Sequence, residues 1–201
     1  MIRNRSISVM TWARVAGTLA AAYIGLRLGG LPASSLTGRA DVVAEAARVV
    51  RVIDGDTYVL LSGATTYRLR LLGVDAPEQG QPFGVQATDS VARLLAPGRV
   101  VLVTRAGRDL YGRTLGAVRM PIATGATAGR AVPLDSLLVV CGWAWAFDPK
   151  RKVAGRAQQQ LAAQRAGRGL WKCGVSEAVT PKLWRSFNSE IKRRYRVGCT
   201  W

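Results

Sequence analysis

The sequence predicts a small β-barrel that carries helices, a fold of the α+β class. Short runs rich in β-branched and aromatic residues recur in the middle of the chain, separated by glycine, proline or aspartate. A segment with helical spacing interrupts these runs, and another helical segment follows the last of them. Strands with so few helices between them favour a barrel over a parallel sheet.

Five strands are expected in this central region. Their ranges, bounded by turn residues, are 48–54, 56–62, 65–74, 99–105 and 113–119. In the third strand, Leu69 and Leu71 alternate with arginines, so the leucines should face one side and the arginines the other.

Three helices are expected around these strands. The first lies in "GVQATDSVARLL" and ends before a Pro-Gly pair. The second, in "PLDSLLVVCGWAWAF", is short and turns at Gly142 into a strand. The third runs roughly from Lys152 to Arg168 and stops at Gly169, which suits a left-handed cap.

The N-terminus differs from the central domain, which is expected to span 46–173. Residues 1–45 are predicted to be a signal peptide or a membrane anchor followed by a linker, because arginines precede an apolar run from Val15 to Leu26. That run fits a signal-peptide core better than a bilayer span, which needs roughly 20 residues. We therefore expect a protein that is secreted, or one anchored outside the cytoplasm with membrane contact through its N-terminus.

Residues 174–201 form a basic extension that is expected to be helical. Thr180 is a suitable N-cap, and Pro181 suits the first helical position. The helix could dock on the barrel, contact nucleic acid or contact a membrane surface, and the sequence leaves these three roles open. Cys173 and Cys199 bracket the extension, and in an exported protein a disulfide between them could tie it down.

Composition restricts the chemistry that the chain can perform. With 29 Lys and Arg against 12 Asp and Glu, the formal charge is +17, which attracts nucleic acid first and anionic membrane second. The chain has no histidine, which excludes Ser-His-Asp and Cys-His schemes and histidine-ligated zinc. Catalysis must therefore rest on carboxylates, arginines, lysines, tyrosines or a hard metal bound through oxygen.

Four of the twelve acidic residues gather in a short part of this basic chain. They are Asp54 and Asp56 in "VIDGDT", and Asp75 and Glu78 in "RLLGVDAPE". Two aspartates with a backbone carbonyl can hold a hard divalent cation, a glutamate can deprotonate water, and two arginines can grip a phosphate. These parts suit phosphodiester cleavage, although each motif alone is also typical of a solvated turn or a surface ion pair.

Taken in order, three motifs closely resemble the staphylococcal nuclease-like (thermonuclease) family: "VIDGDT", "RLLGVDAPE" and "YGRTLGAV". "GQPFG" before the first helix and "GLW" after the last extend the resemblance, which covers roughly Arg48 to Trp171. It implies an OB-fold, a five-stranded barrel carrying three helices. It also implies a Ca²⁺-dependent nuclease that hydrolyses DNA and/or RNA and leaves 3′-phosphates. We expect the protein to act as a monomer.

The resemblance also implies roles for individual residues. Asp56 and Asp75 would be carboxylate ligands of Ca²⁺, and Ala76 would add its main-chain carbonyl. Glu78 would be the general base that activates water. The groups expected to bind the phosphate are Arg70, Arg113 and Tyr111.

The chain departs from the staphylococcal pattern at several positions. Leu110 replaces a lysine, which removes one expected phosphate contact, and the tyrosines of the base pocket are not recovered. In the strand expected after Gly142, the aromatic residues Trp143, Trp145 and Phe147 alternate. Core packing and base stacking both remain open as their role.

A second class of function also remains open. In a non-catalytic nucleic-acid-binding OB-fold module, the positive charge alone would carry binding. Salt dependence cannot separate the two classes, because every phosphate contact releases counterions in both, but cleavage can.

Overall fold

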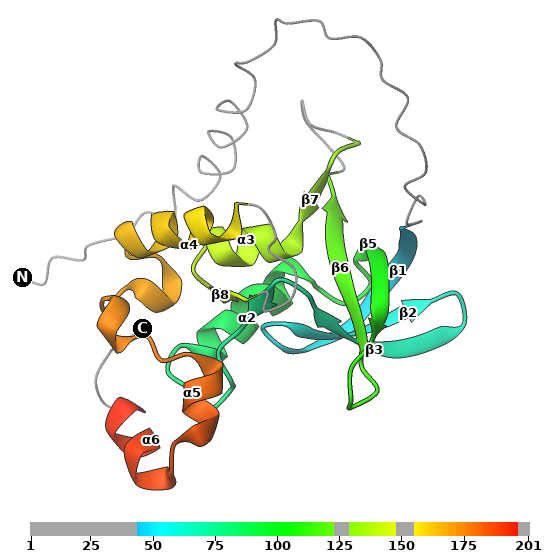
Figure 1. The fold of residues 1–201 in the computed structure, drawn as a ribbon. Coiled ribbons are helices and arrows are strands. Elements are labelled where there is room, and N and C mark those ends of the chain that lie inside the picture. Colours follow the sequence, from blue (N-terminus) through cyan, green and yellow to red (C-terminus); the bar gives the residue numbers. More distant parts are fainter. Residues whose placement is uncertain (1–43, 123–128, 148–154, 197–201) are drawn as a thin grey trace, which may run out of the picture. The chain divides into compact units, whose positions relative to one another are not determined.

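A sheet that curls round and closes on itself forms the centre of the fold in a computed structural model (Figure 1). The strands of the closed barrel are β1 (Glu45–Asp54), β2 (Thr57–Ser62), β3 (Thr65–Leu71), β5 (Val100–Arg108) and β6 (Thr114–Pro121). They pair in the order β3-β2-β1-β5-β6, and the parallel pairing of β6 with β3 closes the ring. The predicted five-stranded barrel is therefore confirmed.

The structure describes residues 44–122, 129–147 and 155–196, which belong to one compact unit, Val42–Trp201. Almost all of the predicted N-terminal segment, and Cys199, lie outside the described residues. Cys173 does form a disulfide bond. No helix within the described ranges combines the length and the apolar character needed to cross a membrane. The boundaries of the predicted domain and of its two flanking segments stay predictions.

Short strands and helices surround the barrel. Strand β7 (Ala131–Pro133) adds to the sheet beside β6, while β4 (Val74–Asp75) pairs with β8 (Trp145–Ala146). The α-helices of the described residues are α2 (Gly84–Leu94), α3 (Leu134–Val140), α4 (Arg156–Arg165), α5 (Pro181–Ser186) and α6 (Ser189–Arg196). Two short 3₁₀ helices, Gly169–Trp171 and Val175–Glu177, connect α4 to α5.

The barrel interior is filled by alternate residues of its strands, as the pleat of a strand requires. Leu69 and Leu71 are buried, as expected, while Arg68 on the opposite face of the strand is exposed. Tyr58 is also fully buried, and its hydroxyl donates a hydrogen bond to the main-chain oxygen of Gly55 (2.9 Å). This bond connects the centre of the barrel to the turn between β1 and β2.

A second apolar cluster lies around Phe83, Trp145 and Trp171. The rings of the two tryptophans meet edge to face, with centroids 5.6 Å apart. Trp145 is thus a core residue, as the packing alternative proposed. Phe147 differs from it because its side chain is exposed.

The helices differ from the prediction in two ways. The described residues contain five α-helices rather than three, because the extension folds as two short helices. Phe187 adopts an extended conformation between them, and the Asn188 side chain accepts a hydrogen bond from the N–H of Ile191, which begins a new helix. In addition, α4 ends before Gly167, and this residue, rather than Gly169, occupies the left-handed position at the helix terminus.

Candidate active site

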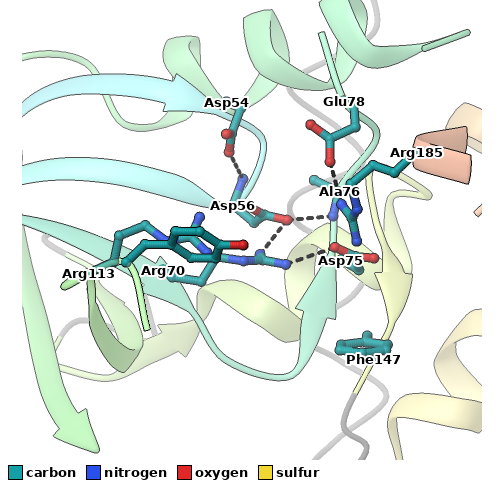
Figure 2. A pocket seen from close by; sticks show the side chains of 10 residues that line it. Asp54, Asp56, Arg70, Asp75, Ala76, Glu78, Arg113, Phe147 and Arg185 are labelled. Atoms are coloured by element: carbon teal, nitrogen blue, oxygen red, sulfur yellow. Dashed lines mark hydrogen bonds and ion pairs between the residues drawn. The ribbon is translucent and has the colours of Figure 1, made fainter. Parts of the chain in front are cut away.

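One cavity of about 310 Å³ collects all of the site residues that the sequence predicted (Figure 2). Asp56 comes from the turn between β1 and β2, and Arg70 from the end of β3. Asp75 lies on β4, and the segment after it carries Glu78. The cavity is lined by Asp54, Asp56, Arg70, Asp75, Ala76, Glu78, Tyr111, Arg113, Phe147 and Arg185.

Arg70 lies between the two aspartates that were predicted as metal ligands. Its guanidinium forms an ion pair with Oδ2 of Asp56 and donates a hydrogen bond to Oδ1 of Asp75 (2.8 Å). Asp56 is only 6% exposed. Burial raises the pKa of Asp56 to about 7, although Arg70 acts in the opposite direction. One guanidinium therefore does not compensate the burial of two carboxylates.

The backbone around Asp56 holds this carboxylate in place. The N–H of Asp56 donates a hydrogen bond to Oδ1 of Asp54 (3.0 Å), and the hydroxyl of Thr57 donates to Oδ1 of Asp56 (3.3 Å). Ala76 donates its main-chain N–H to Oδ2 of Asp56 (2.6 Å). The structure thus brings Ala76 to Asp56 through its nitrogen, and the metal-binding role of its carbonyl stays a prediction.

The chemistry of these donors fits a hard divalent cation. Asp56 and Asp75 supply oxygen ligands. Burial raises the pKa of both carboxyl groups, and a bound cation would stabilise their ionised forms. Within the described residues, no three Asp, Glu, Cys or His side chains converge on one metal position. Main-chain, water or phosphate oxygens would have to complete the coordination.

Glu78 follows β4 in a loop that is fixed at both ends. The side chain of Gln81 accepts a hydrogen bond from the N–H of Glu78 (3.1 Å), and the N–H of Gln81 donates to the Glu78 carbonyl (2.9 Å). A Cβ at Gly84 would lie 1.9 Å from that carbonyl oxygen, so only glycine lets α2 begin this close to the loop. The Glu78 carboxylate itself is 43% exposed and faces Arg185.

Arg113 is held by an acidic residue that the sequence reasoning missed. Its Nε donates to Oδ2 of Asp109 (2.7 Å), while Oδ1 of Asp109 accepts from the N–H groups of Tyr111 and Arg113 (2.9 Å each). Despite some burial, the hydrogen bonds from Arg113 lower the pKa of Asp109. The guanidinium lies 5.7 Å from the ring centre of Tyr111, so the Tyr-Gly-Arg turn is one ordered unit.

A comparison with protein families matches residues 68–173 to the model described as "Staphylococcal nuclease homologue", which is more than half of the chain. A relative from Escherichia coli O157:H7, named "Uncharacterized endonuclease", is 36% identical over 138 residues. That alignment covers 69% of this chain and 83% of the relative. This chain belongs to the staphylococcal nuclease family.

Further relatives carry more specific names. A "Micrococcal nuclease" of Shigella flexneri is 37% identical over 139 residues, covering 68% of this chain and 78% of its own length. A "Thermonuclease" of Staphylococcus hyicus is 36% identical over 134 residues, covering 62% and 74%. The predicted staphylococcal nuclease family is confirmed. The more general prediction of a nuclease, a hydrolase whose substrate is nucleic acid, is confirmed as well.

The departures from the staphylococcal nuclease pattern have different structural consequences. Leu110 is fully exposed and does not line the cavity, so nothing at this position replaces the expected lysine contact. Phe147 does line the cavity and is 45% exposed, whereas Trp145 is buried. Of Trp143, Trp145 and Phe147, for which base stacking remained open, only Phe147 therefore lines the site.

Three residues beside the cavity had no assigned role in the sequence reasoning: Asp109, Gln81 and Arg185. Asp109 stands four positions before Arg113 and could have been noticed as its partner. Gln81 belongs to the "GQPFG" motif, but nothing in that motif shows which groups its amide binds. Arg185 lies beyond the range of the family model and carried no local signal.

Proposed function

We propose that this member of the staphylococcal nuclease family is a Ca²⁺-dependent nuclease that hydrolyses phosphodiester bonds in DNA and/or RNA. One observation carries the proposal. Two buried carboxylates, a partly exposed glutamate and two arginines face the same cavity of about 310 Å³. A module that only bound nucleic acid would have no need for acidic groups in a cavity that must receive a phosphate.

Asp56, Asp75 and the carbonyl of Ala76 would hold the cation. When bound, Ca²⁺ supplies positive charge that polarises the phosphoryl oxygen and neutralises the charge that develops in the transition state. The raised pKa of Asp56 supports this assignment, because a buried carboxylate that Arg70 alone does not compensate favours a second positive partner.

Arg70 and Arg113 would grip the phosphate. Arg70 reaches the cavity between the two aspartates, where Nη1 is paired with Oδ2 of Asp56 and Nη2 with Oδ1 of Asp75. Arg113 uses its Nε for Asp109, which leaves its terminal nitrogens for a phosphate. Two guanidinium groups can bind phosphate oxygens bidentately and stabilise added charge. Tyr111, beside Arg113, would add a further contact.

Glu78 would act as general base. Its carboxylate takes a proton from water, and the water oxygen forms a bond to phosphorus. The bond from phosphorus to the 5′ oxygen breaks, and that oxygen takes up a proton from solvent. The products are a 3′-phosphate and a free 5′-hydroxyl. The partial exposure of Glu78 supports this role, because the attacking water must reach its carboxylate from solvent.

Digestion of single-stranded DNA and of RNA with Ca²⁺ and with a chelator tests the proposal. We expect cleavage with Ca²⁺, loss of cleavage with the chelator, and recovery when Ca²⁺ is added back. Binding measured in parallel should persist at low salt in both conditions, because the positive charge remains. Equal cleavage in both conditions would remove the metal from the mechanism, and binding without any cleavage would favour the non-catalytic module.

The location of the protein is a separate proposal, for which the arginines and the apolar run of residues 1–45 are the support. We propose that this segment exports the nuclease, either as a cleaved signal peptide or as a retained anchor, and that the exported protein acts as a monomer. Mass spectrometry of the N-terminus of protein isolated from its source would distinguish cleavage from retention. A full-length protein recovered from the cytoplasm would contradict export.

A further inference from the structure

The C-terminal extension reaches the cavity through helix α5 (Pro181–Ser186). The helix is seated firmly, since Pro181 and Trp184 are buried and Val179 before it is buried as well. Thr180 caps its first turn by accepting a hydrogen bond from the N–H of Leu183 (3.3 Å). The extension therefore has a defined position relative to the residues that line the cavity.

Two contacts join this extension to the segment that carries Glu78. In the first, the buried side-chain amide of Gln81 both accepts and donates a hydrogen bond. Its oxygen accepts from the N–H of Glu78 (3.1 Å), and its nitrogen donates to the main-chain oxygen of Val179. Gln81 thus links the backbone of the Glu78 loop to the residue that immediately precedes the Thr180 cap.

The second contact involves the side chain of Glu78 itself. Arg185 extends from α5 toward the loop, and its Nη1 donates a hydrogen bond to Oε1 of Glu78 (Figure 2). The bond occupies only one carboxylate oxygen. Among the residues that the structure describes, Oε2 makes no hydrogen bond or ion pair, so it can accept a proton from water.

We propose that Arg185 is a positioning residue that holds the carboxylate of Glu78 in its working orientation, so that the C-terminal extension is part of the active site. The inference rests on the proposed role of Glu78 as general base. A glutamate side chain has several rotatable bonds, and a half-exposed one samples many orientations unless something holds it. Arg185 limits these orientations while it occupies only Oε1.

The ion pair between Arg185 and Glu78 orients the Glu78 side chain more than it stabilises the fold. Glu78 and Arg185 are 43% and 56% exposed, and exposed ion pairs contribute little to stability. Arg185 also differs from Arg70 and Arg113, which contact the aspartates Asp56, Asp75 and Asp109. Among the described residues its hydrogen bond goes to the proposed base, and it acts on Asp75 through its charge alone, which favours the ionised form of that carboxylate. We therefore expect its removal to affect the proton-transfer step more than substrate binding.

The test compares Arg185→Ala with a matched control, Lys182→Ala. Lys182 is exposed on the same helix, carries the same charge and does not line the cavity. We expect Arg185→Ala to lower kcat on single-stranded DNA about tenfold, which corresponds to about 1.4 kcal/mol. KM and the melting temperature should stay close to the wild type, and Lys182→Ala should leave all three values unchanged. Arg185→Lys keeps the charge but not the planar fork and should recover part of kcat.

A double-mutant cycle with Glu78→Gln shows whether Arg185 acts through Glu78. In the Glu78→Gln background, Arg185→Ala should cause no further loss of single-turnover rate. A wild-type rate in Glu78→Gln alone would refute the proposed base, whatever Arg185 does. If Glu78→Gln is impaired, three results would overturn the positioning role alone: an additive loss in the double variant, a rise in KM without a fall in kcat, or a faster Arg185→Ala enzyme.

Discussion

Glu78→Gln is expected to lower kcat about a thousandfold while KM for single-stranded DNA changes little. Glutamine keeps the size of the side chain and can still accept a hydrogen bond from Arg185, but it cannot take a proton from water. A thousandfold loss corresponds to about 4 kcal/mol of transition-state stabilisation. Steady-state kinetics at saturating Ca²⁺ measures both parameters.

Glu177→Gln is the control for this variant. It makes the same chemical change at an exposed glutamate of the second 3₁₀ helix, outside the cavity, and should behave as the wild type. The Glu78 variant should also melt at nearly the wild-type temperature, since its carboxylate is partly exposed. An active Glu78→Gln enzyme would show that another group accepts the proton.

Arg113→Lys is the second change expected to have a large effect, with kcat/KM also lowered about a thousandfold. Arginine is held by its Nε on Asp109 and presents its terminal nitrogens to the phosphate. Lysine keeps the charge but has no Nε donor and no planar fork, so it loses both the anchor and the bidentate contact. Cleavage rates at several substrate concentrations give kcat/KM directly.

Arg119→Lys provides the comparison, on the strand that follows the Tyr-Gly-Arg turn. Arg119 is exposed on β6, lies outside the cavity and, among the residues described, donates only to the main-chain oxygen of Ala131 (3.2 Å). Its replacement should leave kcat/KM within about twofold of the wild type, as for most surface substitutions. Equal losses in the two variants would mean that general charge, rather than the Arg113 fork, drives the effect.

The barrel and much of its cavity could be predicted because their signals are local. The alternation around Leu69 and Leu71 places Arg70 on the opposite face of β3, at the side of the cavity. The Asp-Gly-Asp turn and the Asp-Ala-Pro-Glu segment each present carboxylates at the end of a strand. In such motifs the chain itself fixes the spacing, so the sequence alone is informative.

The extension could not be predicted in the same way. Arg185 and Glu78 are 107 positions apart, and no motif connects them. Helical spacing also suggested one continuous helix, because apolar residues recur on both sides of Phe187 and Asn188. The local capping bond of Asn188 outweighs that periodicity and starts a second helix. Contacts between distant segments depend on packing that a single sequence does not reveal.

The buried hydroxyl of Tyr58 makes the shape of one acidic turn depend on the packing of the whole barrel. Because Tyr58 belongs to the centre of the barrel and holds the Gly55 carbonyl, the turn that bears Asp54 and Asp56 acquires its shape only when the interior is packed. A partly unfolded chain therefore lacks the arrangement of Asp54 and Asp56 that the folded barrel provides. Assembly of this acidic turn should coincide with packing of the barrel interior.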